Sequence, residues 1–245
     1  MSKMVAVCCR ITLECSQRWS PPRMIAETKL AEMLCTRLCH DLTGPIGAVN
    51  NGAEFLDDEG FDMQNDAVQL IVSSAHEAVN RLMFYRQAYG RVSDSGEASL
   101  EEKKKLAKDF FSNTKITLDW PDTHTDACGI SISQKMSRLI LNMLLLCSAT
   151  LIRGGTVSVR ITRNELGDKQ VSVRGVGETI KTDPDMLTIL KGQGDDAQLS
   201  PKTAQAFLAL KIAEEVGAQL AIDAAGDHFD MVATQRQMLL ASAAG

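Results

Sequence analysis

Apolar residues recur every three or four positions over residues 25–90, the spacing that predicts amphipathic helices. The first series of apolar positions consists of Leu30, Leu34, Leu38, Leu42, Ile46, Val49 and Leu56. After an acidic interruption at residues 57–60, a second series alternates steps of four and three residues, as heptad repeats do. Its members are Val68, Val72, Ala75, Val79 and Leu82. Two long helices joined by a short polar turn predict an antiparallel helical hairpin over residues 24–90.

A hairpin of this kind has more apolar surface than its two helices can cover for each other. Each helix carries an apolar stripe, but each has only one partner within the hairpin. A second copy of the chain would cover the remaining surface and close a four-helix bundle. We therefore expect a homodimer whose dimerisation domain is the hairpin.

The pattern becomes mixed beyond residues 91–99, whose serine, aspartate and glycine are typical of a linker. Residues 100–239 are expected to form a two-layer α/β sandwich, because helical and alternating segments there share one core. The expected helices are residues 100–111, 134–152 and 200–216, and the expected strands are residues 116–120, 156–162, 170–174, 219–223 and 228–233. With a poorly ordered extension at residues 1–23 and a tail at residues 240–245, the chain is predicted to be an α+β protein.

The composition of the chain argues against nucleic acid and membranes as partners. The 245 residues carry 26 Lys plus Arg and 31 Asp plus Glu, and a net-acidic chain without a basic block is a poor candidate for binding nucleic acid. Three consecutive lysines at residues 103–105 are expected on a solvated helix face, or alternatively to dock an acidic partner. No apolar run approaches the roughly 20 residues of a membrane span. Seven cysteines without a CxxC pair are typical of reduced thiols, so we expect a cytoplasmic protein without a membrane partner.

A histidine, an acid and a proline stand together inside the first predicted helix. These residues are His40, Asp41 and Pro45. Proline inside a helix removes a hydrogen bond and costs about 3 kcal/mol, so its place one turn after a histidine calls for a functional reason. At about 100° per residue, His40 points almost opposite to the apolar stripe, and we expect its ring to be exposed.

The same helical geometry places four further residues on the His40 face: Arg37, Gly44, Gly47 and Asn51. An imidazole is a good nucleophile near neutral pH. Asp41 could hold one ring N–H or act as a base, and Arg37 could offset phosphoryl charge. The glycines leave room for the backbone of another protein, so Gly44, Gly47 and Asn51 are candidate partner-binding residues. The alternative is that His40 is a solvated surface histidine without a catalytic role. The presence of Asp41 and Pro45 beside it favours a catalytic histidine.

The segment His40-Asp41-Leu42, followed by Gly44-Pro45-Ile46, resembles the H-box of two-component histidine kinases. The longer stretch at residues 34–52 is similar to the ChpT family, the histidine phosphotransferases of alphaproteobacteria. This resemblance implies a dimeric hairpin followed by a degenerate kinase-like ATPase domain. It implies a phosphorelay in which a receiver-domain aspartate passes a phosphoryl group to His40, and His40 passes it on to response regulators.

The resemblance also implies particular partners. The donor would be the receiver domain of a hybrid histidine kinase (CckA-like), and the acceptors would be response regulators (CtrA-like and CpdR-like). The protein would need no cofactor of its own, because the magnesium ion is supplied by the partner receiver domain.

A working kinase of this type needs an ATP site, and this chain departs from the family pattern at three places. Asn142 matches the first asparagine of the motif N-L-L-x-N, but Leu146 occupies the second position and leucine cannot ligate magnesium. Val173 replaces the adenine-reading aspartate before a Gly-x-Gly pair. Residues 203–208 contain no glycine that could wrap phosphates. We therefore expect no nucleotide-binding and no metal-binding residues.

Two alternatives stay open at this point. The chain could be an ATP-dependent sensor-type histidine kinase, against which the departures at the ATP motifs argue. It could instead be a scaffold that binds response regulators without being phosphorylated. Replacing His40 separates a phosphoryl carrier from a scaffold.

Overall fold

The computed structural model describes residues 23–57, 64–91, 96–121 and 130–236. The predicted N-terminal extension up to residue 22, residues 58–60 of the polar turn and the tail at residues 240–245 lie outside these ranges.

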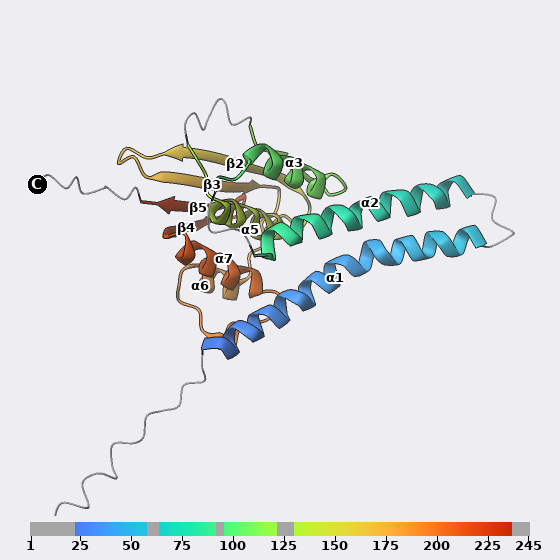
Figure 1. Cartoon of the computed structure of the whole chain (residues 1–245), viewed down its shortest axis with the longest axis horizontal. Coiled ribbons are helices and arrows are strands. Elements are labelled where there is room, and N and C mark those ends of the chain that lie inside the picture. The colour runs from blue at the N-terminus through green and yellow to red at the C-terminus, as the bar shows by residue number, and fades with distance from the viewer. Residues whose placement is uncertain (1–22, 58–63, 92–95, 122–129, 237–245) are drawn as a thin grey trace, which may run out of the picture.

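Two long helices open the chain, α1 (Arg23–Asp57) and α2 (Gln64–Tyr89). They lie side by side and extend well beyond the rest of the molecule (Figure 1). A small residue lets them approach closely: Gly52 is buried, and a Cβ there would lie 2.7 Å from Cγ1 of Ile71 and 3.2 Å from the carbonyl oxygen of Ala67. Pro45 is buried within α1, and the helix continues through it. The predicted helical hairpin is confirmed.

The remainder of the chain is a five-stranded sheet covered on one face by helices, and we call it the sandwich. The strand order is β1 (Ile116–Asp119), β2 (Gly155–Arg163), β3 (Lys169–Val176), β5 (His228–Gln235) and β4 (Ala218–Ala224). Only the pair β1 and β2 is parallel among these strands. The helices are α3 (Leu100–Phe111), α5 (Gln134–Thr150), α6 (Pro184–Leu190) and α7 (Ala204–Glu215), with a 3-10 turn η1 (Asp196–Gln198). The predicted α+β architecture is confirmed.

The core of the sandwich lies between α5 and the sheet. Inward-facing residues alternate along β2, β3 and β5, as expected for strands with one covered face: Val157, Val159, Ile161, Val171, Val173, Phe229, Met231 and Ala233 are buried. Most of α5 is buried as well, because the helix packs on the sheet and on α7. The α1 helix reaches this core through Leu34 and Leu38, which pack against it near the N-terminal end of the hairpin.

Sequence periodicity missed the shortest helices. The α6 helix has seven residues, fewer than the window over which an apolar period can be read. Its start is set by local chemistry instead. The side chain of Asp183 accepts from the backbone N–H groups of Asp185 and Met186, and Pro184 stands at the first helical position.

The lysine prediction was wrong for two of the three side chains. Lys103 and Lys104 are buried, 8% and 7% exposed, and only Lys105 lies in solvent. The α3 helix turns this side towards α2, where Lys103 Nζ donates to Oε1 of Gln87 at 2.7 Å. Burial lowers the pKa of Lys103. A long side chain can cover apolar surface with its methylene groups while its amine finds a polar partner.

A buried polar network joins the end of α2 to α5 and α7. Asn142 is fully buried, and its Nδ2 donates to the carbonyl oxygens of Ala88 at 2.9 Å and Arg138 at 2.8 Å. Its Oδ1 accepts from Gln205, whose Oε1 accepts from the hydroxyl of Tyr89 at 2.6 Å. The guanidinium of Arg138 donates to the carbonyl oxygens of Ala88 and Tyr89. The network thus pairs backbone carbonyls that the end of a helix leaves without intrahelical partners.

We predict that Asn142→Leu lowers the free energy of unfolding by about 1–3 kcal/mol. The substitution leaves the buried amide of Gln205 without its acceptor, and an unsatisfied buried polar group costs about that much. Urea unfolding followed by circular dichroism measures the effect. Asn50→Leu, at an exposed position of α1, is the matched control and should change stability by no more than about 0.5 kcal/mol. Equal stability of the two variants would show that the network is dispensable.

Candidate functional site

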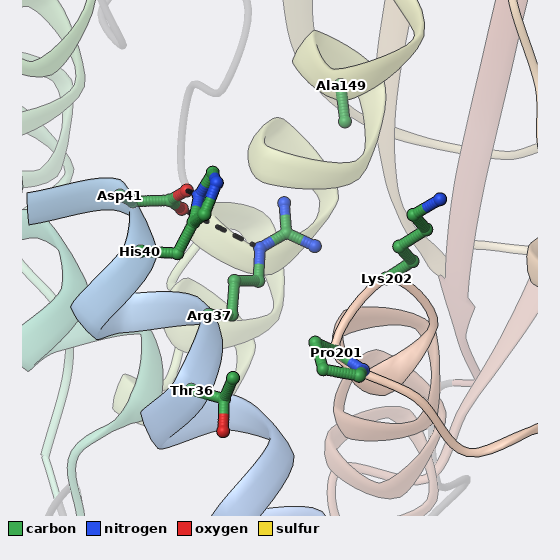
Figure 2. Close-up of a pocket in the computed structure, with 7 residues that line it drawn as sticks. All are labelled: Thr36, Arg37, His40, Asp41, Ala149, Pro201 and Lys202. Carbon is green, nitrogen blue, oxygen red and sulfur yellow. Dashed lines mark hydrogen bonds and ion pairs between the residues drawn. The ribbon is translucent and has the colours of Figure 1, made fainter. Parts of the chain in front are cut away.

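His40 lies near the middle of α1 with its ring in solvent. The side chain is 87% exposed, as the helical geometry of the sequence predicted. Figure 2 shows it on the side of α1 that faces the start of α7. The ring is therefore open to a large partner while standing on a rigid element.

One aspartate contacts the histidine and is itself contacted by three other side chains. Oδ1 of Asp41 lies 3.2 Å from Nδ1 of His40. Oδ2 of Asp41 accepts from the hydroxyl of Tyr85 at 2.6 Å and lies 3.8 Å from Nε of Arg37. The backbone oxygen of Asp41 accepts from Arg81 at 3.1 Å. The half-buried carboxylate is thus fixed by the neighbouring helix α2 as well as by its own.

This geometry selects a tautomer of the neutral imidazole. A carboxylate accepts and does not donate, so the ring nitrogen that faces it carries the proton. In His40 that nitrogen is Nδ1, and the lone pair on Nε2 is left free. Nε2 is therefore exposed and can act as a nucleophile, while Nδ1, the other ring nitrogen, faces the negative charge of Asp41.

A cleft opens beside His40 between the hairpin and the sandwich. Its volume is about 530 Å³, and it is lined by Thr36, Arg37, His40, Asp41, Ala149, Pro201 and Lys202. Figure 2 shows the guanidinium of Arg37 extending from α1 into this space, towards the side from which Lys202 enters. Two cations therefore border the space next to an exposed nucleophile, an arrangement suited to an anionic group.

A second groove runs along the hairpin on the other side of Asp41. It is lined by His40, Asp41, Gly44, Pro45, Ala48, Ser74, Glu77 and Arg81. A Cβ built on Gly44 or Gly47 would meet no heavy atom within 4 Å, so the surface there is open. Gly44 lines this groove, whereas Gly47 and Asn51 lie further along α1 and line neither of the two hollows.

The predicted site residues therefore divide into two groups. The structure brings Arg37, His40, Asp41 and Gly44 together, and it does not join Gly47 or Asn51 to them by a contact. The fold brings other lining residues from distant parts of the chain, and these were not predicted: Ala149, Pro201 and Lys202 in the cleft, and Ser74, Glu77 and Arg81 in the second groove.

Tyr85 was missed for a different reason. An aromatic residue within an apolar helix pattern is read as core, and Tyr85 is indeed only 3% exposed. The signal that could have identified it is its hydroxyl, because a buried tyrosine requires a hydrogen-bond partner. Burial, and after it the hydrogen bond to Asp41, raises the pKa of Tyr85 and keeps the hydroxyl protonated as a donor.

The side chains at the positions that resemble ATP motifs are buried and contact other parts of the protein. Both ends of the Asn142 amide are hydrogen-bonded, and Leu146 and Val173 are core residues. A Cβ on Gly175 would lie 2.7 Å from Sγ of Cys147. Burial raises the pKa of the Cys147 thiol to about 12, so this cysteine is a neutral core residue.

The described residues form neither a metal-binding cluster nor a membrane-spanning helix. Among them, no three or more histidine, cysteine, aspartate or glutamate side chains gather as a metal site would require. In the same ranges, no helix combines the length and the apolar character needed to cross a membrane.

Comparisons with known proteins agree on one family. The family model for the histidine phosphotransferase C-terminal domain matches residues 100–228, more than half of the chain. The protein phosphotransferase ChpT of Brucella abortus (strain 2308) is 30% identical over 209 residues, which cover 85% of this chain and 96% of that protein. A bacterial phosphotransferase structure solved at 1.7 Å superposes with a TM-score of 0.70 at 29% identity, over 84% of this chain and 96% of that one.

Proposed function

The chain belongs to the histidine phosphotransferase family, and on that premise we propose that His40 is the residue that carries the phosphoryl group. A protein histidine phosphotransferase of a phosphorelay moves a phosphoryl group to and from a histidine side chain. The observation that supports His40 is its geometry: an imidazole 87% exposed, with Nδ1 against a carboxylate and Nε2 free.

The other histidines of the described ranges lack this combination. His228 is held by carboxylates at both ring nitrogens, Nδ1 by Asp227 at 2.8 Å and Nε2 by Asp223 at 3.4 Å. His76 is exposed on α2, but the acid that follows it, Glu77, is paired with Arg81 at 2.7 Å. His124 lies outside the described residues.

In the proposed reaction the Nε2 lone pair of His40 attacks the phosphorus of an aspartyl phosphate. A bond from phosphorus to Nε2 forms as the bond from phosphorus to the receiver carboxylate breaks, and the electron pair of that bond leaves with the carboxylate. The ring becomes positively charged because Nδ1 keeps its proton, and Asp41 Oδ1 faces that charge. The reverse steps deliver the group to the aspartate of the next regulator.

The cleft beside His40 suits the negatively charged group in transfer. Arg37 is 20% exposed and its Nε lies 3.8 Å from Oδ2 of Asp41, while Figure 2 shows its other nitrogens turned into the cleft. A guanidinium presents planar donors that match phosphoryl oxygens. We propose that Arg37 offsets charge on the phosphoryl group, and that the magnesium ion comes with the receiver domain, as the resemblance to the family implies.

We also propose that ATP is not the phosphoryl donor. The amide of Asn142 is committed to Ala88, Arg138 and Gln205, and freeing it for magnesium would break the junction between the hairpin and the sandwich. The donor and acceptors are proposed to be receiver domains, with a CckA-like hybrid kinase and CtrA-like and CpdR-like regulators as the implied classes.

A second copy of the chain is the proposed occupant of the apolar face of the hairpin. The predicted heptad positions Val68, Val72, Val79 and Leu82 are 43–55% exposed on α2. Ile46, Phe55 and Leu56 add exposed apolar surface from α1. Figure 1 shows that much of the hairpin extends beyond the sandwich, and these apolar side chains stay exposed in the described part of the chain. Pairing along the heptad positions would close a four-helix bundle.

Incubation with a phosphorylated receiver domain should place acid-labile phosphate on His40. His40→Ala should take up none, because the nucleophile is gone, while His76→Ala, a histidine followed by an acid on the other helix, should be labelled like the wild type. Peptide mapping under alkaline conditions locates the phosphate. Labelling of His40→Ala, or of the wild type by ATP alone, would contradict the proposal.

Replacing Arg37 by Gln should slow phosphoryl transfer by about tenfold or more, the effect of losing about 1.4 kcal/mol of transition-state stabilisation. Rapid-quench measurement of transfer from the receiver gives the rate. Lys29→Gln removes a cation from an exposed position of the same helix and should leave the rate unchanged. Equal rates for the two variants would remove Arg37 from the site.

Val79→Glu should convert a dimer into a monomer, because a charge would be buried along the heptad seam. Sedimentation equilibrium should give twice 26.7 kDa for the wild type and 26.7 kDa for the variant. Leu166→Glu is the control, since Leu166 is 83% exposed at a turn of the sandwich. A monomeric wild type would overturn the proposed dimer.

A further inference from the structure

The hydroxyl of Tyr85 is linked to the proposed phosphohistidine, His40, by a single residue, Asp41. Tyr85 is buried on α2, and its O–H donates to Oδ2 of Asp41 at 2.6 Å. The other oxygen of the same carboxylate faces Nδ1 of His40 at 3.2 Å. A buried donor on one helix thus determines the orientation of a carboxylate on the other.

Aromatic neighbours hold the Tyr85 ring in place. Tyr89 stacks on it with ring centroids 5.2 Å apart, and Phe110 meets it edge-on at 5.9 Å. Phe84 also lies edge-on to it, at 6.5 Å. The hydroxyl of Tyr85 therefore has little freedom to leave Asp41.

The other partners of Asp41 do not fix the carboxylate in the same way. Arg81 binds only the backbone oxygen of Asp41. Nε of Arg37 approaches Oδ2 no closer than 3.8 Å, which is too long for a hydrogen bond. Without the hydroxyl of Tyr85, the Asp41 carboxylate could rotate towards Arg37, and Nδ1 of His40 would lose its acceptor.

We propose that Tyr85 is a positioning residue for phosphoryl transfer, holding Asp41 so that the proton of His40 stays on Nδ1 and the lone pair on Nε2. The inference rests on the proposed role of His40. An exposed imidazole without such a partner populates both tautomers, and only one of them presents Nε2 as the nucleophile. Tyr85 does not touch the reacting atoms and acts through Asp41.

Tyr85→Phe tests the proposal in the full-length protein, because it keeps the aromatic packing and removes only the hydroxyl. Long-range ¹H–¹⁵N NMR of His40 in the unphosphorylated protein should show a rise in the Nε2–H tautomer. Transfer from a phosphorylated receiver should slow by about tenfold, the loss expected for a hydrogen bond to a charged group.

Tyr89→Phe is the matched control. It removes a hydroxyl that binds Gln205 rather than Asp41, so it should lower stability and leave the His40 tautomer unchanged. The proposal is overturned if Tyr85→Phe leaves the tautomer or the transfer rate unchanged, or if Tyr89→Phe shifts the tautomer equally.

The same experiment separates a failure of the proposed function from a failure of the proposed role of Tyr85. If wild-type His40 takes up no phosphate, the proposed function fails, while the tautomer of the free protein still reports whether Tyr85 orients Asp41. If His40 is phosphorylated at the same rate in Tyr85→Phe, the proposed function stands and the role of Tyr85 is lost.

Discussion

The site depends on one carboxylate that is shared between an exposed ring and a buried hydroxyl. An imidazole in solvent has no packing to orient it, so its orientation must come from the residues beneath it. Asp41 supplies that link, with Oδ1 at 3.2 Å from His40 and Oδ2 at 2.6 Å from Tyr85. Because Tyr85 is packed among Phe84, Tyr89 and Phe110, the core restrains the carboxylate that faces the exposed ring of His40.

The same aromatic cluster lies where the hairpin meets the sandwich, and the buried network around Asn142 holds this junction together. Asn142 sits where the family resemblance places a magnesium-binding asparagine of kinases. In this structure its amide binds the carbonyl oxygen of Ala88, at the end of the helix that carries Tyr85. A residue type suited to a metal serves here as a structural hydrogen-bonding group. The amide of Asn142 cannot bind a metal ion while it pairs with Ala88, Arg138 and Gln205.

The periodicity of apolar residues in the sequence predicted most of the fold but only part of the site. Heptad spacing predicted α2, and the exposed positions Val68, Val72, Val79 and Leu82 are members of that heptad. The exposure of His40 followed from the rotation per residue along a single helix. Tyr85 lies 44 residues from Asp41, and their contact depends on the axial register of two helices, which no local pattern encodes. Pro201 and Lys202 enter the cleft from the sandwich for the same reason. Lys103 and Lys104 show why composition is not enough to predict burial. Their charge predicted exposure to solvent, but the packing of α3 on α2 buries them.

The central claim is that Nε2 of His40 forms the bond to phosphorus while Nδ1 stays protonated against Asp41. The most direct measurement is heteronuclear NMR of the ¹⁵N-labelled protein after transfer from a phosphorylated receiver. The account predicts ³¹P–¹⁵N coupling to Nε2 of His40, with a proton on Nδ1. Phosphorus bonded to Nδ1, or to any residue other than His40, would contradict it.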